Sequence, residues 1–202
     1  MSAAASRSRL LELRGQLEAA ARGREVLERK RELLLFEIRR RAGPLVVARR
    51  GLASSLAAAR AALAVARVEL GSPLVDAAAL AQPPTTSVEL RAASILGVPV
   101  PRLVAPPAST RPAYGPAGTS ASLDRAVADF CALVPELARL AELEAASAAL
   151  RRGLRKTARR LSALERVVIP RLEADLRAVA GGLEEEERDE ALRLRAWLGR
   201  AR

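Results

Sequence analysis

The strongest constraint on this chain is a repeat of leucine and alanine at intervals of three, four and seven positions. Between Met1 and Leu70 the repeat consists of Leu10, Leu13, Leu17, Ala20, Leu27 and Leu34, followed by Leu52, Leu56, Ala59, Leu63, Ala66 and Leu70. This spacing places apolar side chains along one stripe of an α-helix. It predicts a helix of about 60 residues, roughly 90 Å long at ~1.5 Å per residue. The helix is expected to end at Gly71, Ser72 and Pro73.

A second stripe of the same kind fills the C-terminal part of the chain. Its members are Leu123, Val127, Phe130, Val134, Leu137, Ala141, Leu150, Leu154, Leu161, Leu164, Val168, Leu172, Leu176, Val179 and Leu183. Ser122 is the predicted N-cap, with Asp124 in the first turn. Periodic stretches much longer than ~25 residues are typical of coiled coils.

Two such helices with a connecting region between them predict an all-α fold: a long antiparallel two-helix coiled coil with a small β-hairpin/loop region between the helices. The expected parts are residues 1–70, 71–121 and 122–202. In this register Arg7 and Arg9 approach the carboxylates of residues 184–187. Opposite charges there support the pairing, although each exposed ion pair contributes at most about 1 kcal/mol.

The connecting region has a different composition. Val88, Leu90, Ile95, Val98, Val100 and Val104 predict short extended strands around Gly97. Pro99 and Pro101 exclude a central strand, because proline cannot donate to a β-ladder. We therefore expect a small β-hairpin, with Ile95, Gly97, Val98 and Val100 among its residues, at the far end of the coiled coil. The prolines after it predict a loop.

Pro44 and Pro170 lie inside predicted helices, where proline costs about 3 kcal/mol. Gly43 and Pro44 are interpreted as a kink or local break in the first helix, in preference to a true separation into two helices. Pro170, in "ALERVVIPRLEADL", is either a built-in bend or a plain kink without function.

Composition limits the function classes. Hydrophobic residues make up 50% of the chain and exclude a disordered tail, whereas 2% aromatic residues favour packed helices over a globule. The net charge of +11 is mostly arginine, and residues 1–70 carry 15 basic and 7 acidic side chains. Such a charge is compatible with binding to nucleic acid or anionic lipid.

The single cysteine, Cys131, fits a reducing compartment. We expect neither a signal peptide nor a membrane span, and hence a soluble cytoplasmic protein.

The residue types of most catalytic and metal sites are missing from the sequence. There is no histidine and one cysteine, and no glycine-rich phosphate-binding loop. We therefore predict no catalytic residue, no metal site and no cofactor.

Five features allow both a functional and a structural interpretation. The acidic residues 184–190 suit either a cationic partner or metal, or a solvated face, which is favoured. Cys131 is interpreted as a buried small hydrophobe and not a reactive thiol. Trp197 is either a partner anchor or ordinary helix amphipathicity. The basic residues 39–41 and 151–160 could bind phosphates, but without interleaved aromatic residues a solvated face is favoured.

Three segments resemble one family in the right order along the chain. "KTARRLSALERVVIPRLEADLRAVAGGLEEEERDEALRL", residues 156–194, is similar to the C-terminal helix of the D subunit of V-type (A/V-type) ATPases and ATP synthases, and "VVIPRLE" is its specific core. Residues 6–38 resemble the opening helix of that family. The matching positions are Leu10, Leu11, Leu17, Gly23, Leu27, Lys30, Arg31 and Leu34. "SILGVPVPRL", residues 94–103, is similar to its hairpin segment. The Gly43–Pro44 interruption and the Pro/Ala-rich loop 104–118 depart from the family pattern.

The resemblance implies a non-catalytic central rotor shaft of a V/A-type rotary ATPase or ATP synthase. Implied partners are the catalytic A and B subunits, the small F subunit of the rotor and the funnel-shaped subunit over the membrane rotor ring. The implied location is the cytoplasmic face of the membrane, peripherally and without insertion. The residues expected to meet the head are Lys30, Arg31, Lys156, Arg159, Arg160, Arg166, Pro170 and Arg171.

Two other classes remain open from the residues alone. A coiled-coil adaptor or secretion-apparatus stalk protein would share the helices but would not need the hairpin. An arginine-rich nucleic-acid-binding coiled coil would show steep salt dependence on DNA.

Overall fold

The computed structural model describes residues 6–81, 87–105, 113–115 and 118–200. The chain forms two compact units, and each is considered separately below. Unit 1 contains residues 1–33 and 154–202, and unit 2 contains residues 34–153. The predicted class is confirmed, because long helices dominate and a two-stranded antiparallel hairpin lies between them in the sequence.

Helix α1 (Arg7–Leu70) has 64 residues, close to the predicted length. Ser6 begins it: the Arg9 N–H donates to Ser6 Oγ at 3.2 Å, and the Leu10 N–H donates to the Ser6 carbonyl at 3.0 Å. This is the geometry of a serine N-cap. Gly71 ends the helix in the left-handed region, with φ of 81°, as the Gly-Ser-Pro sequence predicts.

The Gly43–Pro44 pair does not separate the chain into two helices, because α1 continues through Pro44. Proline there removes one N–H from the helical ladder but does not end the helix. Two turns before it, Glu37 accepts hydrogen bonds from the Arg40 and Arg41 side chains. Leu34 is completely buried before the proline, and after it Arg49 pairs with Glu144 of the second long helix at 2.7 Å.

The second long helix consists of α3 (Ala121–Ala163), η1 (Leu164–Val168) and α4 (Ile169–Arg200). The Ser120 carbonyl accepts the Leu123 and Asp124 N–H groups at 3.0 and 3.3 Å. The helix therefore begins just before the predicted cap at Ser122. Asp124 lies in the first turn, as expected.

Pro170 follows a π-helical turn. The Ile169 N–H donates to the Leu164 carbonyl, five positions back, which is the π pattern. An α-helix would place the proline ring against the carbonyl four positions back, on Arg166. The wider turn relieves this clash, and kinks in helices commonly coincide with such turns. Leu164 Cδ1 lies 3.9 Å from where a Cβ would stand on Gly23 of α1.

In unit 1, the start of α1 pairs antiparallel with α4. Arg7 Nη2 lies 2.9 Å from Glu187 Oε1, which confirms that Arg7 meets the acidic run. Arg9 does not reach that run, because its guanidinium pairs with Glu12 on the same helix at 2.8 Å. Leu13 and Leu161 are almost completely buried in this unit.

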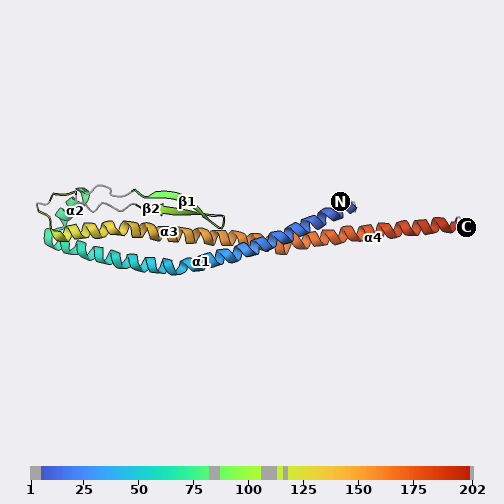
Figure 1. The fold of residues 1–202 in the computed structure, drawn as a ribbon, viewed down its shortest axis with the longest axis horizontal. Helices are drawn as coiled ribbons and strands as arrows, with labels where there is room; N and C mark the ends of the chain where they lie inside the picture. Colours follow the sequence, from blue (N-terminus) through green and yellow to red (C-terminus); the bar gives the residue numbers. More distant parts are fainter. Residues whose placement is uncertain (1–5, 82–86, 106–112, 116–117, 201–202) are drawn as a thin grey trace. The chain divides into compact units, whose positions relative to one another are not determined.

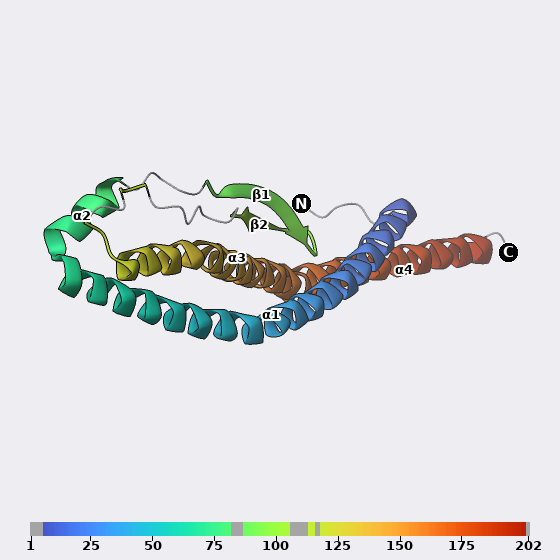
Figure 2. The same cartoon turned by 60° about the vertical axis from the view of Figure 1, so that its left-hand side comes forward.

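In unit 2, the second half of α1 runs beside α3 (Figures 1 and 2). Arg49 Nη2 lies 2.7 Å from Glu144 Oε1, and Ser55 Oγ donates to Glu136 at 3.3 Å. Leu34 and Leu150 have no exposed surface. The predicted stripes are confirmed at Leu34, Ala59, Leu123 and Leu150, which are buried, but not at Phe130 and Leu137, which are exposed. Ala126, Leu133 and Ala138 are buried on that part of α3 instead.

A short helix, α2 (Ser72–Ala81), covers the end of unit 2 at which α1 stops and α3 starts. Val75 and Ala78 of α2 pack with Ala66 and Leu123 in one buried cluster, against which Tyr114 also packs. Helix α2 was not predicted from the sequence. Its "GSP" start was interpreted only as a stop signal, although serine and proline also begin helices.

Strands β1 (Glu89–Ile95) and β2 (Val98–Val104) form the predicted hairpin, with Ile95 directly opposite Val98. The tight turn between them has φ of 53° at Leu96 and 72° at Gly97. Two positive φ values are those of a type I′ turn, whose twist matches that of the strands. Glycine adopts this conformation freely, whereas Leu96 is strained in it.

The hairpin does not lie at the far end of the coiled coil, as predicted, but alongside α3 (Figures 1 and 2). Its buried Val98 contacts Gly153, far along α3 from the start of that helix at Ala121. A Cβ on Gly153 would stand 2.7 Å from Val98 Cγ2. The Leu103 N–H also donates to Glu142 of α3 at 3.1 Å. The missing side chain of Gly153 thus lets a β-branched residue pack directly on the helix.

One result differs from the expected absence of a membrane span. Helix α1 contains an 18-residue window with mean hydropathy of 1.3, long and apolar enough by composition to cross a membrane, of which 11% is buried. Such a window is weak evidence for a span. The window is apolar because this part of α1 is rich in alanine and valine. Most of these side chains are exposed on the helix surface.

Gly153→Ala should displace the hairpin from α3. The new methyl group meets Val98, whose χ1 angle is stiff, so the strain should exceed the helix-propensity gain of about 1 kcal/mol for removing glycine. We expect a net loss of about 1–2 kcal/mol in the free energy of unfolding by urea. Gly51→Ala in α1 is the matched control, because no atom lies within 4 Å of its Cβ position. It should be neutral or stabilising, and equal effects of the two changes would refute the contact.

Tyr114 provides a pH-dependent prediction. Burial, and then the hydrogen bond from its hydroxyl to Asp124 at 2.7 Å, raise the pKa of Tyr114 above its ordinary value near 10. The stabilisation is thus fully present below about pH 10 and is lost as the pH rises above the folded-state pKa. Tyr114→Phe should cost about 1 kcal/mol of unfolding free energy at neutral pH. Tyr114 is the sole tyrosine, so phenolate absorbance reports its titration directly. A midpoint at about pH 10 in the folded protein would contradict this.

Candidate docking surfaces

The cations expected to meet a partner all belong to unit 1. Lys156, Arg159 and Arg160 are exposed on α3, and Lys30 and Arg31 are half-buried on α1. Arg166 lies in η1 and Arg171 in α4, both exposed, with Pro170 between them. Within the described residues, none of these cations takes part in an ion pair. Their charges are therefore free to attract an acidic surface.

The antiparallel pairing brings the two sets of cations to a similar level. Gly23 faces Leu164, and Lys30 lies about two helical turns further along α1. Lys30 therefore lies near the level of residue 157. Lys156, Arg159 and Arg160 are on the same turns of α3. We call Lys30, Arg31, Lys156, Arg159 and Arg160 the basic ridge. Arg166 and Arg171 lie about two and three turns away from it.

A groove of about 400 Å³ lies between α1 and α4 near the Arg7–Glu187 ion pair. Its apolar lining consists of Leu10, Leu11, Ala180 and Leu183, and its charged lining of Arg7, Arg14, Glu184 and Glu187. Leu11 is 66% exposed in this groove. The acidic run 184–190 is thus only partly neutralised by the pairing of the helices.

The end of α4 has no described helix beside it. Helix α1 begins at Arg7, opposite Glu187, whereas α4 continues to Arg200. About 20 Å of helix therefore extends past the last ion pair. The exposed large apolar side chains of this segment are Leu192, Leu194, Trp197 and Leu198. Trp197 is 69% exposed, and large amphipathic side chains of this kind are common anchors in interfaces.

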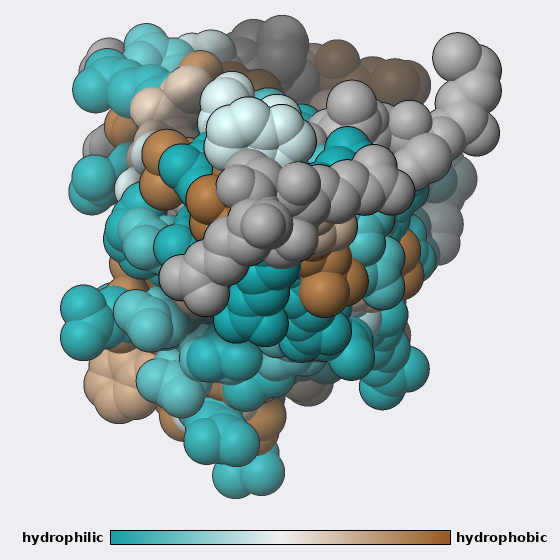
Figure 3. Space-filling model, turned by 90° about the vertical axis from the view of Figure 1, so that its right-hand side faces the viewer, coloured by the Kyte–Doolittle hydropathy of each residue, from teal (hydrophilic) through white to brown (hydrophobic). Residues whose placement is uncertain are grey.

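Unit 2 contains a groove of about 570 Å³ between α1 and the start of α3. Ala58, Ala61, Ala62 and Val65 line it on α1. Small side chains allow another backbone to approach closely. On the face of the molecule shown in Figure 3, the described surface is mostly hydrophilic with separate hydrophobic patches.

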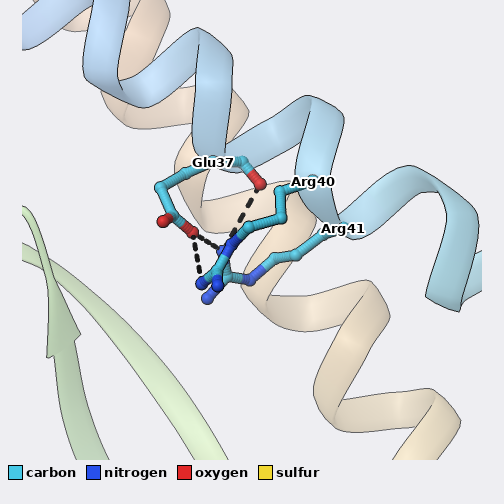
Figure 4. Close-up of polar contacts among 3 residues, drawn as sticks. All are labelled: Glu37, Arg40 and Arg41. Atoms are coloured by element: carbon cyan, nitrogen blue, oxygen red, sulfur yellow. Dashed lines mark hydrogen bonds and ion pairs between the residues drawn. The ribbon is translucent and has the colours of Figure 1, made fainter.

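Part of the arginine excess is neutralised locally in a way that the sequence analysis missed. Glu37 receives the guanidinium groups of both Arg40, at 3.2 Å, and Arg41 (Figure 4). Glu37 and Arg41 side chains are each only 17% exposed. The signal was the i, i+3 and i, i+4 spacing of glutamate before arginine. Residues 39–41 are therefore not a free phosphate-binding cluster.

The remaining candidates have no evident chemistry. Cys131 is half-buried, less than predicted. In the described ranges there is no group of three or more His, Cys, Asp or Glu side chains arranged to hold a metal ion. The hairpin residues predicted as a base, Ile95, Gly97, Val98 and Val100, lie at the β-turn and its adjoining strands, and Val98 and Val100 are buried.

Comparison with known proteins gives one consistent match. The profile of the family described as the ATP synthase D subunit matches residues 9–198. The V-type ATP synthase D subunit of Thermus thermophilus is 35% identical over 198 residues, covering 96% of this chain and 87% of the relative. The A-type ATP synthase D subunit of Pyrococcus furiosus is 32% identical, covering 94% and 90%. That of Thermotoga neapolitana, V-type, is 32% identical, covering 96% of both.

The matches span both long helices and the hairpin, which are the elements whose geometry is described above. The resemblance to this family, first indicated by motifs such as "VVIPRLE", is confirmed over residues 9–198. This chain belongs to the D subunit family of A-type and V-type ATP synthases.

Proposed function

We propose that the chain is the central rotor shaft of an A/V-type ATP synthase or ATPase. In this role it couples ATP hydrolysis or synthesis in the catalytic head to rotation of the membrane ring, without catalysing a reaction itself. The observation that supports this best is the end of unit 1. There a paired antiparallel stem passes into one helix, the end of α4, which has no described helix beside it and on which Trp197 is exposed.

An elongated helical end of this kind suits insertion into a ring of subunits. The exposed apolar side chains of α4 beyond Glu187 are costly in water and gain burial inside a sleeve. The start of α1 and the last part of α4 lie at the same end of unit 1, because the helices are antiparallel. This end is therefore our candidate for the part held by the A and B subunits.

Coupling would arise from asymmetry. The basic ridge lies at one level of unit 1, and the acidic run 184–190 lies at another. The shaft consists of two different helices and carries different residues on its different sides, so it cannot present the same face to three equivalent catalytic interfaces at once. Each rotation angle would stabilise a different nucleotide state at each interface. The ridge would act by electrostatic guidance, which is sensitive to salt.

The remaining partners of the proposal are the small F subunit of the rotor and the funnel-shaped subunit above the membrane ring. The exposed alanine-lined groove of unit 2 is available to such partners. As a member of an ATP synthase, the chain is part of a membrane-associated complex, and we propose a peripheral cytoplasmic position. We prefer the rotor shaft to the adaptor and nucleic-acid alternatives because the chain belongs to the D subunit family.

The test is affinity purification of the tagged full-length chain from native membranes, followed by mass spectrometry. A single shaft in a three-fold head requires two large ATPase subunits at about three copies each per tagged chain. Recovery of nucleic acid, or of self-associated chain without ATPase subunits, would refute the proposal.

Charge reversal on the basic ridge should weaken coupling. In the reassembled complex, Arg159→Glu combined with Arg160→Glu should lower ATP-driven ion pumping more than ATP hydrolysis, and the loss should shrink as salt rises. Arg159→Lys with Arg160→Lys is the matched control, because it keeps the charge, and it should pump almost normally. Circular dichroism should show unchanged helix content in both. Equal pumping by all three proteins would remove the ridge from the mechanism.

A further inference from the structure

The two edges of the β-hairpin differ in their hydrogen-bonding capacity. Ile95 and Val98 flank the tight turn and therefore exchange hydrogen bonds with each other. Because bonded and non-bonded pairs alternate, Leu90, Ala92 and Ser94 of β1 point their backbone groups away from β2. Pro99, Pro101 and Leu103 of β2, directly opposite them, point theirs away from β1.

The outer edge of β2 is closed to a further strand. Pro99 and Pro101 have no N–H to donate. The third donor, the Leu103 N–H, is already bonded to the carboxylate of Glu142 on α3. Both views in Figures 1 and 2 show β2 nearer to α3 than β1. Natural edge strands are commonly blocked in this way.

The outer edge of β1 has none of these blocks. It contains no proline, and among the described residues the outward N–H and C=O groups of Leu90, Ala92 and Ser94 have no partner. All three residues are exposed. They offer a row of alternating donors and acceptors at the spacing of a strand.

The side chains beside this edge favour an extended apolar segment. The hairpin face turned away from α3 contains Leu90, Ala92 and Ser94 with Pro99, Pro101 and Leu103, and no charged side chain. Solvent faces of antiparallel sheets are normally polar. Leu90 is 71% exposed on this face. An exposed apolar patch on a soluble surface is a common sign of an interaction site.

The inner face adds a charge preference. Arg91 and Arg102 are directly opposite each other, which is unfavourable for like charges. Glu89 pairs with Arg91 at 3.0 Å, and Arg102 has no acidic partner among the described residues. Glu89, Arg91 and Arg102 together carry one net positive charge, and a carboxylate on an added strand would lie next to Arg91, the nearer of the two arginines.

We propose that the outer edge of β1 is a docking site for an extended segment of another subunit of the complex, which adds to the hairpin as a third strand. The segment is uncharged next to Leu90, Ala92 and Ser94 and carries an acidic side chain next to Arg91. This inference rests on the proposed function, because it takes the partner from the assembled complex. The close packing of Val98 on Gly153 and the Glu142 hydrogen bond hold the hairpin ready for the added strand.

Hydrogen exchange at single-residue resolution tests the proposal on the isolated full-length chain and on the complex purified with it. In the isolated chain the amides of Leu90, Ala92 and Ser94 should exchange freely, whereas those of Ala93 and Ile95 should be protected by β2. In the complex the first three should slow by about a hundredfold or more. Exchange unchanged in an assembled complex overturns this inference alone. Failure of the chain to join any complex overturns the proposed function as well.

Two variants separate strand addition from simple burial. Ala92→Pro removes an N–H that is not hydrogen-bonded to β2. Residue 92 lies directly opposite Pro101 in the hairpin. In its complex the protection at Leu90 and Ser94 should be lost, whereas the control Ala92→Val keeps the N–H and the protection. If Ala92→Pro loosens the ladder amides of the isolated chain, Ser94→Pro serves instead. Protection that persists in the proline variant refutes strand addition. Protection already present in the isolated chain, with dimers in sedimentation, identifies the occupant as a second copy and also overturns the proposal.

Discussion

The structure depends on the register in which the two long helices pair. In unit 2 the first helix advances from Arg49 to Glu69 while its partner retreats by almost the same length, from Glu144 to Ser122. Leucine and alanine side chains must meet on facing stripes at every turn, so a slip by one position would rotate one stripe by about 100° away from the other. Exposed ion pairs contribute little energy. Some shifts of one helix along the other would leave the apolar contacts between the helices nearly unchanged. The ion pairs favour one of these registers over the others.

Much of the fold followed from local patterns. The length of α1 came from the leucine repeat and from Gly71, which adopts the left-handed conformation expected of a helix end. The hairpin came from alternating apolar residues around Gly97. The Arg7 contact came from counting positions backward along an antiparallel partner. These features depend on nearest neighbours along the chain or on one repeating period, which a sequence displays directly.

Other features could not be obtained in this way, because they depend on packing between distant residues. The position of the hairpin follows from the contact of Val98 with Gly153, far apart in the sequence, and a glycine inside a helix gives no indication of its neighbour. The continuity of α1 through Gly43 and Pro44 is a second feature of this kind, because local propensity takes no account of contacts with a partner helix such as the Arg49–Glu144 pair. The basic ridge illustrates a third limit. Its residues were named from their similarity to a family, and their alignment at one level appeared only with the register.

The separation of paired residues along the sequence has a consequence for folding. Glu69 and Ser122, next to α2, are 53 residues apart, whereas Arg7 and Glu187 are 180 residues apart. The entropy lost on closing a loop grows with its length, although slowly. Pairing that starts beside α2 and proceeds outward closes the shorter loop first, and each later pair then forms next to an existing one. Folding should therefore begin beside α2, and the pairing of the two terminal segments should form last and open first. The paired end that we assign to the catalytic head would then be the least stable part of the isolated chain. Binding to the head would stabilise this part more than any other.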